Sequence, residues 1–334
     1  MVRRSRQNSY SDLRFFIEQS LENSSGFGSR VEIDGKLNRI ADGLWHDNYW
    51  FWIRGRGLTP AQAEQAYVLR ILKHGEEWQR GPEPRERLLR EAETLQVLSR
   101  SNFSHPTPRF ITFVEDADSQ CVGMIETGLS GYSLGSYRDR STLRHVSRVA
   151  ADVHRFDIND FSHLPSSDNR KAHIELRFAE LDESLCAEFH LAGDICRWIA
   201  DYIPAVDSCC VLHGDLLPQN LLSEWPSAEQ QDAPVAVVDW EMAQVWEPAY
   251  ELAIVSRGDR KVLGVKNGLK VFVEEYLDCG GQPVSVDDVR VHEFLLLLNW
   301  LEESWREYQK PVPRGHGPDY YEAKLLSLFR STIG

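Results

Sequence analysis

The chain of 334 residues lacks three features, and each absence argues against a class of protein. Its six cysteines form no CxxC pair and no regular spacing, which argues against a disulfide scaffold or a structural zinc site. The longest apolar block, Phe294–Leu298, is too short to cross a bilayer. The net charge is -14, so a broad nucleic-acid-binding surface is not expected. Because no apolar leader begins the chain, we expect a cytoplasmic protein with no membrane partner.

The pattern of apolar residues changes near residue 126. Before it, we predict helices at 11–21 and 84–98 and extended segments at 37–53, 67–72, 110–114 and 120–125. After it, we predict helices at 141–155, 171–189, 194–202, 266–277 and 288–308, and only two strands. The predicted fold class is therefore α+β, with a β-rich N-terminal lobe over residues 1–126 and a mainly helical C-terminal lobe over residues 127–334.

Each of these two strands of the second half leads into an aspartate. The first is followed by HGDLLPQN (213–220), which contains Asp215 and Asn220, and the second ends in Asp239. We expect both strands to deliver these side chains to one edge of a sheet. Two carboxylates and a carboxamide are the groups that Mg-assisted phosphoryl transfer needs, as a base and as oxygen ligands. Taken alone, Asp215 would equally suit a turn that hydrogen-bonds its own backbone.

HGDLLPQN followed by VVDWE resembles the aminoglycoside phosphotransferase and choline kinase-like family, within the protein-kinase-like superfamily. The resemblance implies a bilobal kinase-like fold that binds MgATP between its lobes, with GTP as the alternative donor. It also implies that Asp215 is the catalytic base and that Asn220 and Asp239 are Mg ligands. His213 would anchor the loop without taking part in proton transfer.

The resemblance continues in WEPAYELA (246–253), with departures from the family's G-D-P-x-x-D-L-A stretch. A Trp-Glu pair replaces Gly-Asp, and Glu251 stands where the family carries an aspartate. That aspartate braces the catalytic loop through backbone hydrogen bonds. Because Glu251 has one more methylene, we expect it to brace the loop with a different geometry.

The first half should then hold the nucleotide. In this superfamily a basic residue on a strand contacts the phosphates and pairs with a glutamate from a helix. The predicted strand 67–72 offers Arg70, and Lys73 follows it, so the choice between the two stays open. Glu91 lies within the apolar stripe of the predicted helix 84–98, where an acid needs a cationic partner. Glu91 is therefore the expected partner of Arg70.

Two further positions match the nucleotide site of the family more loosely. Gly43 is the lone glycine of residues 40–51 and stands where the family has its glycine loop, although it equally suits an ordinary hairpin turn. Glu126 begins the Glu-Thr-Gly sequence that follows a predicted strand. It matches the hinge at which backbone groups hold the adenine.

The predicted activity is transfer of the γ-phosphoryl group of ATP to a hydroxyl of a small molecule. A cationic acceptor is one candidate, because the helix 288–308 carries Trp300, Glu302, Glu303 and Trp305, and acidic and aromatic residues recognise cations in this family. The same residues also suit an amphipathic helix with a solvated face. The sequence leaves the acceptor and the oligomeric state open.

Two alternatives to a small-molecule kinase remain. One is a catalytically weak, pseudokinase-like module that binds nucleotide and regulates a partner, which Arg70, the single glycine and Glu251 would suit. The complete set of Asp215, Asn220 and Asp239 argues against it. The other is a protein kinase, but only about eight residues separate Asp239 from Pro248, too few for a phosphorylated activation loop.

Overall fold

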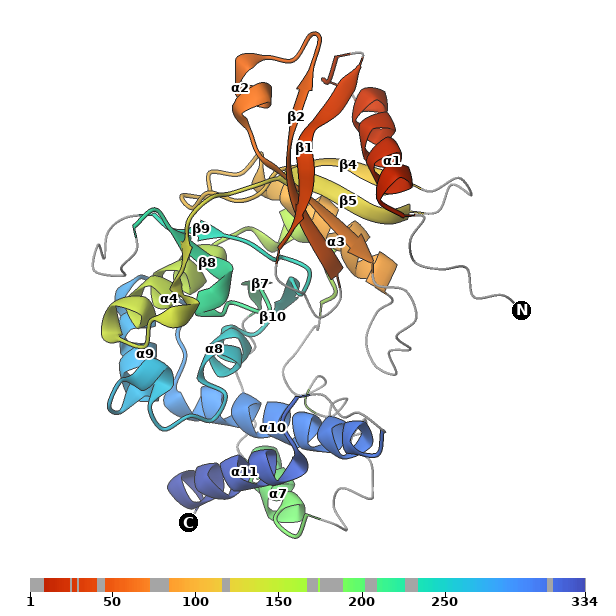
Figure 1. Cartoon of the computed structure of the whole chain (residues 1–334). Coiled ribbons are helices and arrows are strands. Elements are labelled where there is room, and N and C mark those ends of the chain that lie inside the picture. The colour runs from red at the N-terminus through yellow and green to blue at the C-terminus, as the bar shows by residue number, and fades with distance from the viewer. Residues whose placement is uncertain are drawn as a thin grey trace. The chain divides into compact units, whose positions relative to one another are not determined.

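A computed structural model describes residues 9–24, 26–28, 30–40, 46–72, 84–115, 121–166, 174, 189–201, 209–225, 234–310 and 315–333. The chain divides into two compact units. The first comprises Met1–Asn102 with Pro106–Ser130, and the second comprises Phe103–His105 with Gly131–Gly334. The first is built on a sheet and the second is mainly helical, which confirms the predicted α+β class (Figure 1). In the described ranges, no helix is both long and apolar enough to cross a membrane.

One five-stranded antiparallel sheet, in the order β1-β2-β3-β5-β4, forms the first unit. Its strands are β1 (Val31–Arg39), β2 (His46–Gly55), β3 (Tyr67–Leu72), β4 (Phe110–Glu115) and β5 (Cys121–Thr127). Helix α1 (Ser9–Asn23) covers one face, where Ile17 and Leu21 share a buried core with Leu69. Helix α3 (Pro84–Leu98) lies on the opposite face, toward which Arg70 points (Figure 1).

Strand β3 and helix α3 have the bounds that the sequence predicted, but the first hairpin begins earlier. Strand β1 starts at Val31 and not at residue 37. Val31 and Ile33 are the buried side chains of β1, and Leu37 packs partly buried against the same core, but polar residues and Gly35 lie between Ile33 and Leu37, so the alternation is weak. The connection between β2 and β3 contains a short helix, α2 (Pro60–Glu64), which begins with a capping box between Thr59 and Gln62.

Six helices dominate the described part of the second unit. They are α4 (Arg140–Val153), α7 (Ala192–Asp201), α8 (Pro248–Ser256), α9 (Gly268–Asp278), α10 (Val286–Tyr308) and α11 (Pro318–Thr332). The sequence analysis missed α8 because it is apolar on nearly every side, which leaves no helical stripe. It also missed α11, in which only Leu325 and Leu328 are buried. Nearly all of the predicted helix 171–189 lies outside the described residues.

Two small sheets lie among these helices. Strand β7 (Cys210–Leu212) pairs with β10 (Gln244–Trp246). In the other sheet, β8 (Leu221–Ser223) lies between β6 (Tyr132–Ser133) and β9 (Ala236–Val237). The prediction of only two strands in this half is therefore wrong, because strands of two or three residues carry no recognisable alternation. The expectation that β7 and β9 share one sheet edge is also wrong, since they belong to different sheets.

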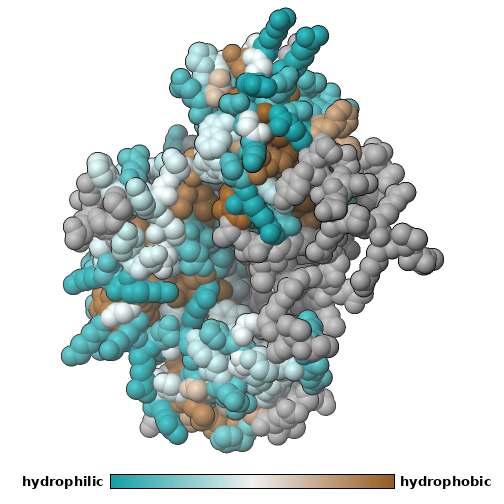
Figure 2. Space-filling view, viewed as in Figure 1, coloured by the Kyte–Doolittle hydropathy of each residue, from teal (hydrophilic) through white to brown (hydrophobic). Residues whose placement is uncertain are grey.

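Each unit has a hydrophobic core of its own. In the second unit, α7, α10 and α11 enclose a core that includes Ile195, Phe294 and Leu325, all fully buried. Phe294 also meets the ring of Trp198 edge to face, with the ring centroids 5.4 Å apart. On the visible face, hydrophilic side chains are mixed with smaller apolar groups (Figure 2). Single exposed apolar residues such as Phe15, 59% exposed, are ordinary on a protein surface.

Substitution Phe294→Ala should lower the free energy of unfolding by about 3–5 kcal/mol, because it leaves a cavity among α7, α10 and α11. The matched substitution Phe15→Ala on the surface of α1 should change it by less than about 1 kcal/mol. Urea unfolding followed by circular dichroism compares the two. Equal losses of stability would contradict the assignment of Phe294 to the core.

Candidate active site

The loop that carries Asp215 follows β7 and is tied to the segment of Asp239. The backbone N–H of Val238 donates to the carbonyl of Asn220 at 3.0 Å, and His213 Nε2 lies 3.0 Å from the carbonyl of Val238. Burial lowers the pKa of His213, which favours a neutral ring whose Nδ1 accepts from Asp215 N at 3.3 Å. His213 thus anchors the loop, as predicted. These contacts, and not a shared sheet, bring Asp239 to the loop.

Gly214 forms the sharp turn at the start of this loop. Its φ is +80°, in the left-handed region, and a Cβ at this position would lie 1.9 Å from the carbonyl oxygen of Met242. Glycine alone meets both requirements, because it has no side chain and adopts positive φ without strain. The close approach packs the segment that follows Asp239 against the loop.

Glu251, in the first turn of α8, holds the backbone of the loop in place. Its carboxylate accepts hydrogen bonds from the backbone N–H groups of His213 at 2.6 Å, Gly214 at 3.1 Å and Leu216 at 3.4 Å. The side chain is fully buried, and the amino-terminal end of α8 favours its negative charge. The longer glutamate therefore performs the bracing that the sequence predicted.

A second group of side chains lies behind Glu251. His154, which caps the end of α4, places Nε2 at 3.9 Å from a Glu251 carboxylate oxygen and Nδ1 at 2.8 Å from the hydroxyl of Tyr276. Burial by itself would raise the pKa of Glu251, but the His154 and His213 rings and the N–H of Gly214 together hold that pKa below its ordinary value. Glu251 is therefore a buried carboxylate that stays ionised.

Asp215 has a different neighbour at each carboxylate oxygen. Asn220 Nδ2 donates to Oδ2 at 3.0 Å and to the Asp215 carbonyl at 2.8 Å, while Arg257 Nη2 lies 4.0 Å from Oδ1. Burial raises the pKa of Asp215 to about 7, the charge of Asp239 adds to the rise, and Arg257 and Asn220 oppose it. A carboxylate with this pKa suits general-base chemistry near neutral pH.

Asp239 and Asn220 carry side-chain oxygen atoms in the neighbourhood of this carboxylate. Asp239 has a φ of 70°, a conformation that aspartate tolerates better than most side chains, and it is partly exposed. Because Asn220 Nδ2 faces Asp215, its Oδ1 remains as an oxygen donor. Across the described ranges, no three His, Cys, Asp or Glu side chains gather into a metal cluster. A single carboxylate with a carboxamide fits Mg, which completes its coordination with phosphate oxygens and water.

The first unit contains the ion pair that the sequence predicted between Arg70 and Glu91. Arg70 Nη1 donates to Glu91 Oε1 at 2.5 Å, and both side chains are buried. Arg70 Nη2 also lies 3.4 Å from Nδ1 of His46 on β2. Arg70 lies on the face of β3 opposite Leu69, as the alternation of side chains along a strand requires. Lys73, the alternative, lies outside the described residues.

The other expected nucleotide contacts receive less support from geometry. Gly43 lies outside the described residues. Glu126 is buried at the end of β5, and the next two N–H groups are used within the unit. Thr127 N donates to Arg109 O at 2.9 Å, and Gly128 N donates to Ala66 O at 2.8 Å. The role of Glu126 at an adenine stays a prediction.

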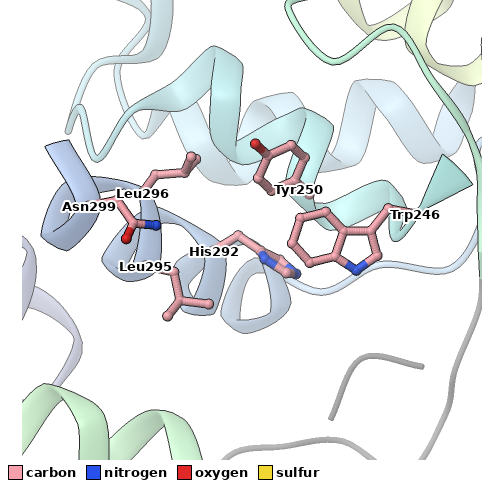
Figure 3. A pocket seen from close by; sticks show the side chains of 6 residues that line it. All are labelled: Trp246, Tyr250, His292, Leu295, Leu296 and Asn299. Carbon is pink, nitrogen blue, oxygen red and sulfur yellow. The ribbon is translucent and has the colours of Figure 1, made fainter. Parts of the chain in front are cut away.

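A hollow lies between α8 and α10 (Figure 3). It is lined by Trp246, Tyr250, His292, Leu295, Leu296 and Asn299. The rings of Trp246 and Tyr250 are 4.4 Å apart, and His292 Nε2 is 3.0 Å from the carboxylate of Glu247. The residues that replace the family's Gly-Asp pair therefore contact α10, through the rings of Trp246 and His292, whose centroids are 5.1 Å apart, and through the buried hydrogen bond between Glu247 and His292.

The sequence analysis missed two residues around the loop, His154 and Arg257. Both follow the last turn of a helix, and Arg257 has a left-handed backbone with a φ of 51°. No local pattern marks either residue, because each reaches the loop only through helix packing. Of the residues named on α10, Glu302 is buried and pairs with Arg306 at 2.5 Å, and Trp300 and Trp305 pack against the core of the unit.

A braced loop with an aspartate, an asparagine five residues later and a second aspartate is the arrangement of a phosphotransferase of the protein-kinase-like class. The buried Arg70–Glu91 pair in the sheet-based unit belongs to the same class. Comparison with known proteins gives the family. The model of the phosphotransferase enzyme family (APH) matches residues 36–278, and the chain belongs to this family. Comparison with curated protein sequences gives no match.

Solved structures share the fold over nearly the whole chain. Macrolide 2'-phosphotransferase MphH from Brachybacterium faecium is 16% identical, with 95% of this chain and 98% of that chain covered and a TM-score of 0.63. Aminoglycoside 2'-phosphotransferase-IIIa, solved with GDP, is 16% identical over 96% of this chain and 97% of that chain, with a TM-score of 0.60. A thermostable APH(4)-Ia mutant, solved with ADP and hygromycin B, is 15% identical over 91% of this chain and 96% of that chain, with a TM-score of 0.61. At these identities the likeness establishes the fold alone.

Substitution Glu251→Gln should lower the free energy of unfolding at pH 7 by about 1.5–3 kcal/mol, because charge-assisted hydrogen bonds are lost and an amide group faces backbone donors. The pKa of Glu251 is lower in the folded protein than in the unfolded chain, so its stabilising effect is complete above the unfolded value of 4.5 and disappears as the pH falls through the folded value. Urea unfolding between pH 7 and pH 3.5 should show the gap between wild type and variant closing below pH 4.5.

The control is Glu32→Gln on β1, where the side chain is 57% exposed and pairs with Arg54. Its effect should be under about 1 kcal/mol. A gap between wild type and Glu251→Gln that stays constant down to pH 3.5 would contradict the ionised state of Glu251.

Proposed function

We propose that this chain transfers the γ-phosphoryl group of ATP, or of GTP, to a hydroxyl of a small molecule. Family membership supports small-molecule phosphoryl transfer as the reaction class. The observation that carries the proposal is the braced loop, which holds Asp215 and Asn220 beside Asp239. Burial and the neighbouring Asp239 raise the pKa of Asp215, which agrees with a role as a base.

Asp215 is the proposed base. The hydroxyl oxygen of the acceptor attacks the γ-phosphorus, and the bond from that phosphorus to the β,γ-bridging oxygen breaks, so that ADP leaves. The hydroxyl proton passes to the Asp215 carboxylate, which Asn220 holds in one orientation through Nδ2. Little covalent chemistry falls to the protein, so positioning of the hydroxyl provides most of the rate.

Asn220 and Asp239 are the proposed Mg ligands. When bound, the ion supplies positive charge that neutralises the phosphate oxygens. Arg70 is the proposed phosphate contact of the first unit, and Glu91 holds its guanidinium in place through the buried ion pair. Gly43 and Glu126 are the proposed contacts to the phosphates and the adenine, respectively.

A pseudokinase-like regulatory module is the second candidate. It would bind nucleotide without transferring phosphate, and Arg70, the single glycine Gly43 and Glu251 are the features that suit it. However, Glu251 makes the bracing hydrogen bonds that an active loop needs. We therefore favour the enzyme. The aminoglycoside and macrolide acceptors of structural neighbours do not identify the acceptor of this chain, since a fold hosts many substrates.

Binding of MgATP should raise the unfolding temperature of the wild type. At a hundredfold excess over the dissociation constant, the ligand adds about 2.7 kcal/mol, or a rise of several degrees. Asp239→Asn should remove the Mg-dependent part of this rise, because a carboxylate ligand is lost. Thermal unfolding with MgATP, MgGTP and Mg alone measures the effect. No rise with either nucleotide would overturn the proposal.

Asp215→Asn should leave the nucleotide-dependent rise in place and reduce phosphoryl transfer by about 10²–10⁴-fold. ADP release is measured with a panel of hydroxyl compounds, and the first accepted compound is then used for every variant. Asp278→Asn, an exposed aspartate at the end of α9, is the matched control and should keep full activity. Equal rates for Asp215→Asn and wild type would exclude Asp215 as the base.

A further inference from the structure

Arg257 is a cation at the edge of the candidate active site. Its Nη2 lies 4.0 Å from Asp215 Oδ1, and its side chain is 42% exposed, so a ligand can reach it. The other oxygen of the carboxylate, Oδ2, faces Asn220. The Asp215 carboxylate therefore has two sides. One is at Asn220, a proposed metal ligand, and the other is at Arg257. The acceptor must bring its hydroxyl to Asp215 from the second side, because the first belongs to the nucleotide and its ion.

The backbone and two contacts hold the guanidinium in place. Arg257 is the residue after α8 and has a φ of 51°, a left-handed conformation that is unfavourable for a residue with a side chain. Its Nε donates to the carbonyl of Ile254 at 3.0 Å, and its own carbonyl accepts from Lys324 Nζ at 2.9 Å. Glycine would fit this helix end at lower cost. What the arginine adds is a fixed positive charge beside the base.

Aromatic rings lie next to this charge. The guanidinium lies 5.7 Å from the ring centroid of Trp300 on α10, and Trp300 lies 6.2 Å from the ring of Tyr321 on α11. Burial raises the pKa of Tyr321, Tyr320 and Glu303 add to the rise, and Arg257 opposes it, so the arginine charge reaches this ring as well. Arg257, Trp300 and Tyr321 thus form one surface that adjoins Asp215.

We propose that Arg257 selects the acceptor, and that the acceptor is a hydroxyl compound that also carries a carboxylate or phosphate group. The inference rests on the proposed phosphotransferase activity and names its substrate class. A guanidinium tethered through Nε and placed over an aromatic ring keeps its terminal N–H groups for an anion. Among the described residues, Asp215 is the one acidic side chain within 4.0 Å of the guanidinium, and that distance is beyond hydrogen-bonding range.

The charges around the site agree with a selective role for Arg257. The chain has a net charge of -14, and Asp215, Asp239 and Glu303 are acidic groups of this region. This background repels an anion, so an anionic acceptor requires a dedicated cation beside the base. A polycationic acceptor, in contrast, would meet Arg257 as a like charge at the point where its hydroxyl must react. The arginine therefore disfavours the cationic acceptor that the α10 residues suggested.

The test measures binding to the full chain saturated with MgAMP-PNP, so that the γ-phosphate position is filled. Calorimetric titrations use two matched scaffolds: glucose, glucuronate, glucose 6-phosphate and glucosamine; and glycerol, glycerate, glycerol phosphate and 2-aminopropane-1,3-diol. On at least one scaffold, an anionic probe should bind at least tenfold more tightly than its neutral counterpart. Arg257→Asn should abolish this advantage, and Arg257→Lys should keep part of it.

Two controls separate charge selection from a structural role. Asparagine tolerates the left-handed conformation, so Arg257→Asn should unfold at or above the wild-type temperature. Arg197→Gln removes an exposed positive charge from α7 and should leave the advantage of the anionic probes intact. An advantage below tenfold on both scaffolds, tightest binding of an amine probe, or the same advantage in Arg257→Asn would overturn the proposal. Failure of MgAMP-PNP to bind would overturn the proposed function, and this inference with it, whereas nucleotide binding without anion preference would overturn this inference alone.

Discussion

The carboxylate of Glu251 accepts hydrogen bonds from the backbone N–H groups of His213, Gly214 and Leu216 in the loop that carries Asp215, and the rest of the site depends on this interaction. Three donors at 2.6–3.4 Å fix the loop from its first residue to Leu216. A buried carboxylate is costly unless it is hydrogen-bonded, and here the loop backbone supplies the donors. The same contact therefore stabilises the charge of Glu251 and orders the loop, and neither is possible without the other.

The loop and Glu251 contact two further parts of the second unit. Toward β9, the backbone bonds of Val238 to Asn220 and His213 bring Asp239 next to the loop. Toward α4 and α9, His154 and Tyr276 close the buried space behind Glu251. Two carboxylates are thus crowded beside one another, and their repulsion and burial raise the pKa of Asp215. A strained, charge-dense arrangement of this kind is stable only on a rigid support, which α8 and its contacts with α10 provide.

The departures from the family pattern in WEPAYELA keep the loop supported. Glu251 reaches the loop backbone although it is longer than aspartate, and Glu247 pairs with His292 on α10. Trp246 fills the space beside Tyr250 that a glycine would leave open. Each replacement makes contacts within the second unit, and these contacts hold the loop and α8 in place. For this reason we favour an enzyme over a pseudokinase-like module.

Sequence by itself determined the features that depend on neighbours along the chain. β3 and α3 have the predicted bounds because their periodicity is strong. The helical periodicity placed Glu91 in the apolar stripe of α3, and the resemblance to the family pointed to Arg70 as its partner. Asp215, Asn220 and Asp239 were identified by residue type and spacing. Only the tertiary structure decided that β7 and β9 belong to different sheets and that Arg257 lies beside Asp215. The physical reason is that local periodicity says which face of an element is buried, whereas the partner across that face comes from a distant segment and is chosen by packing.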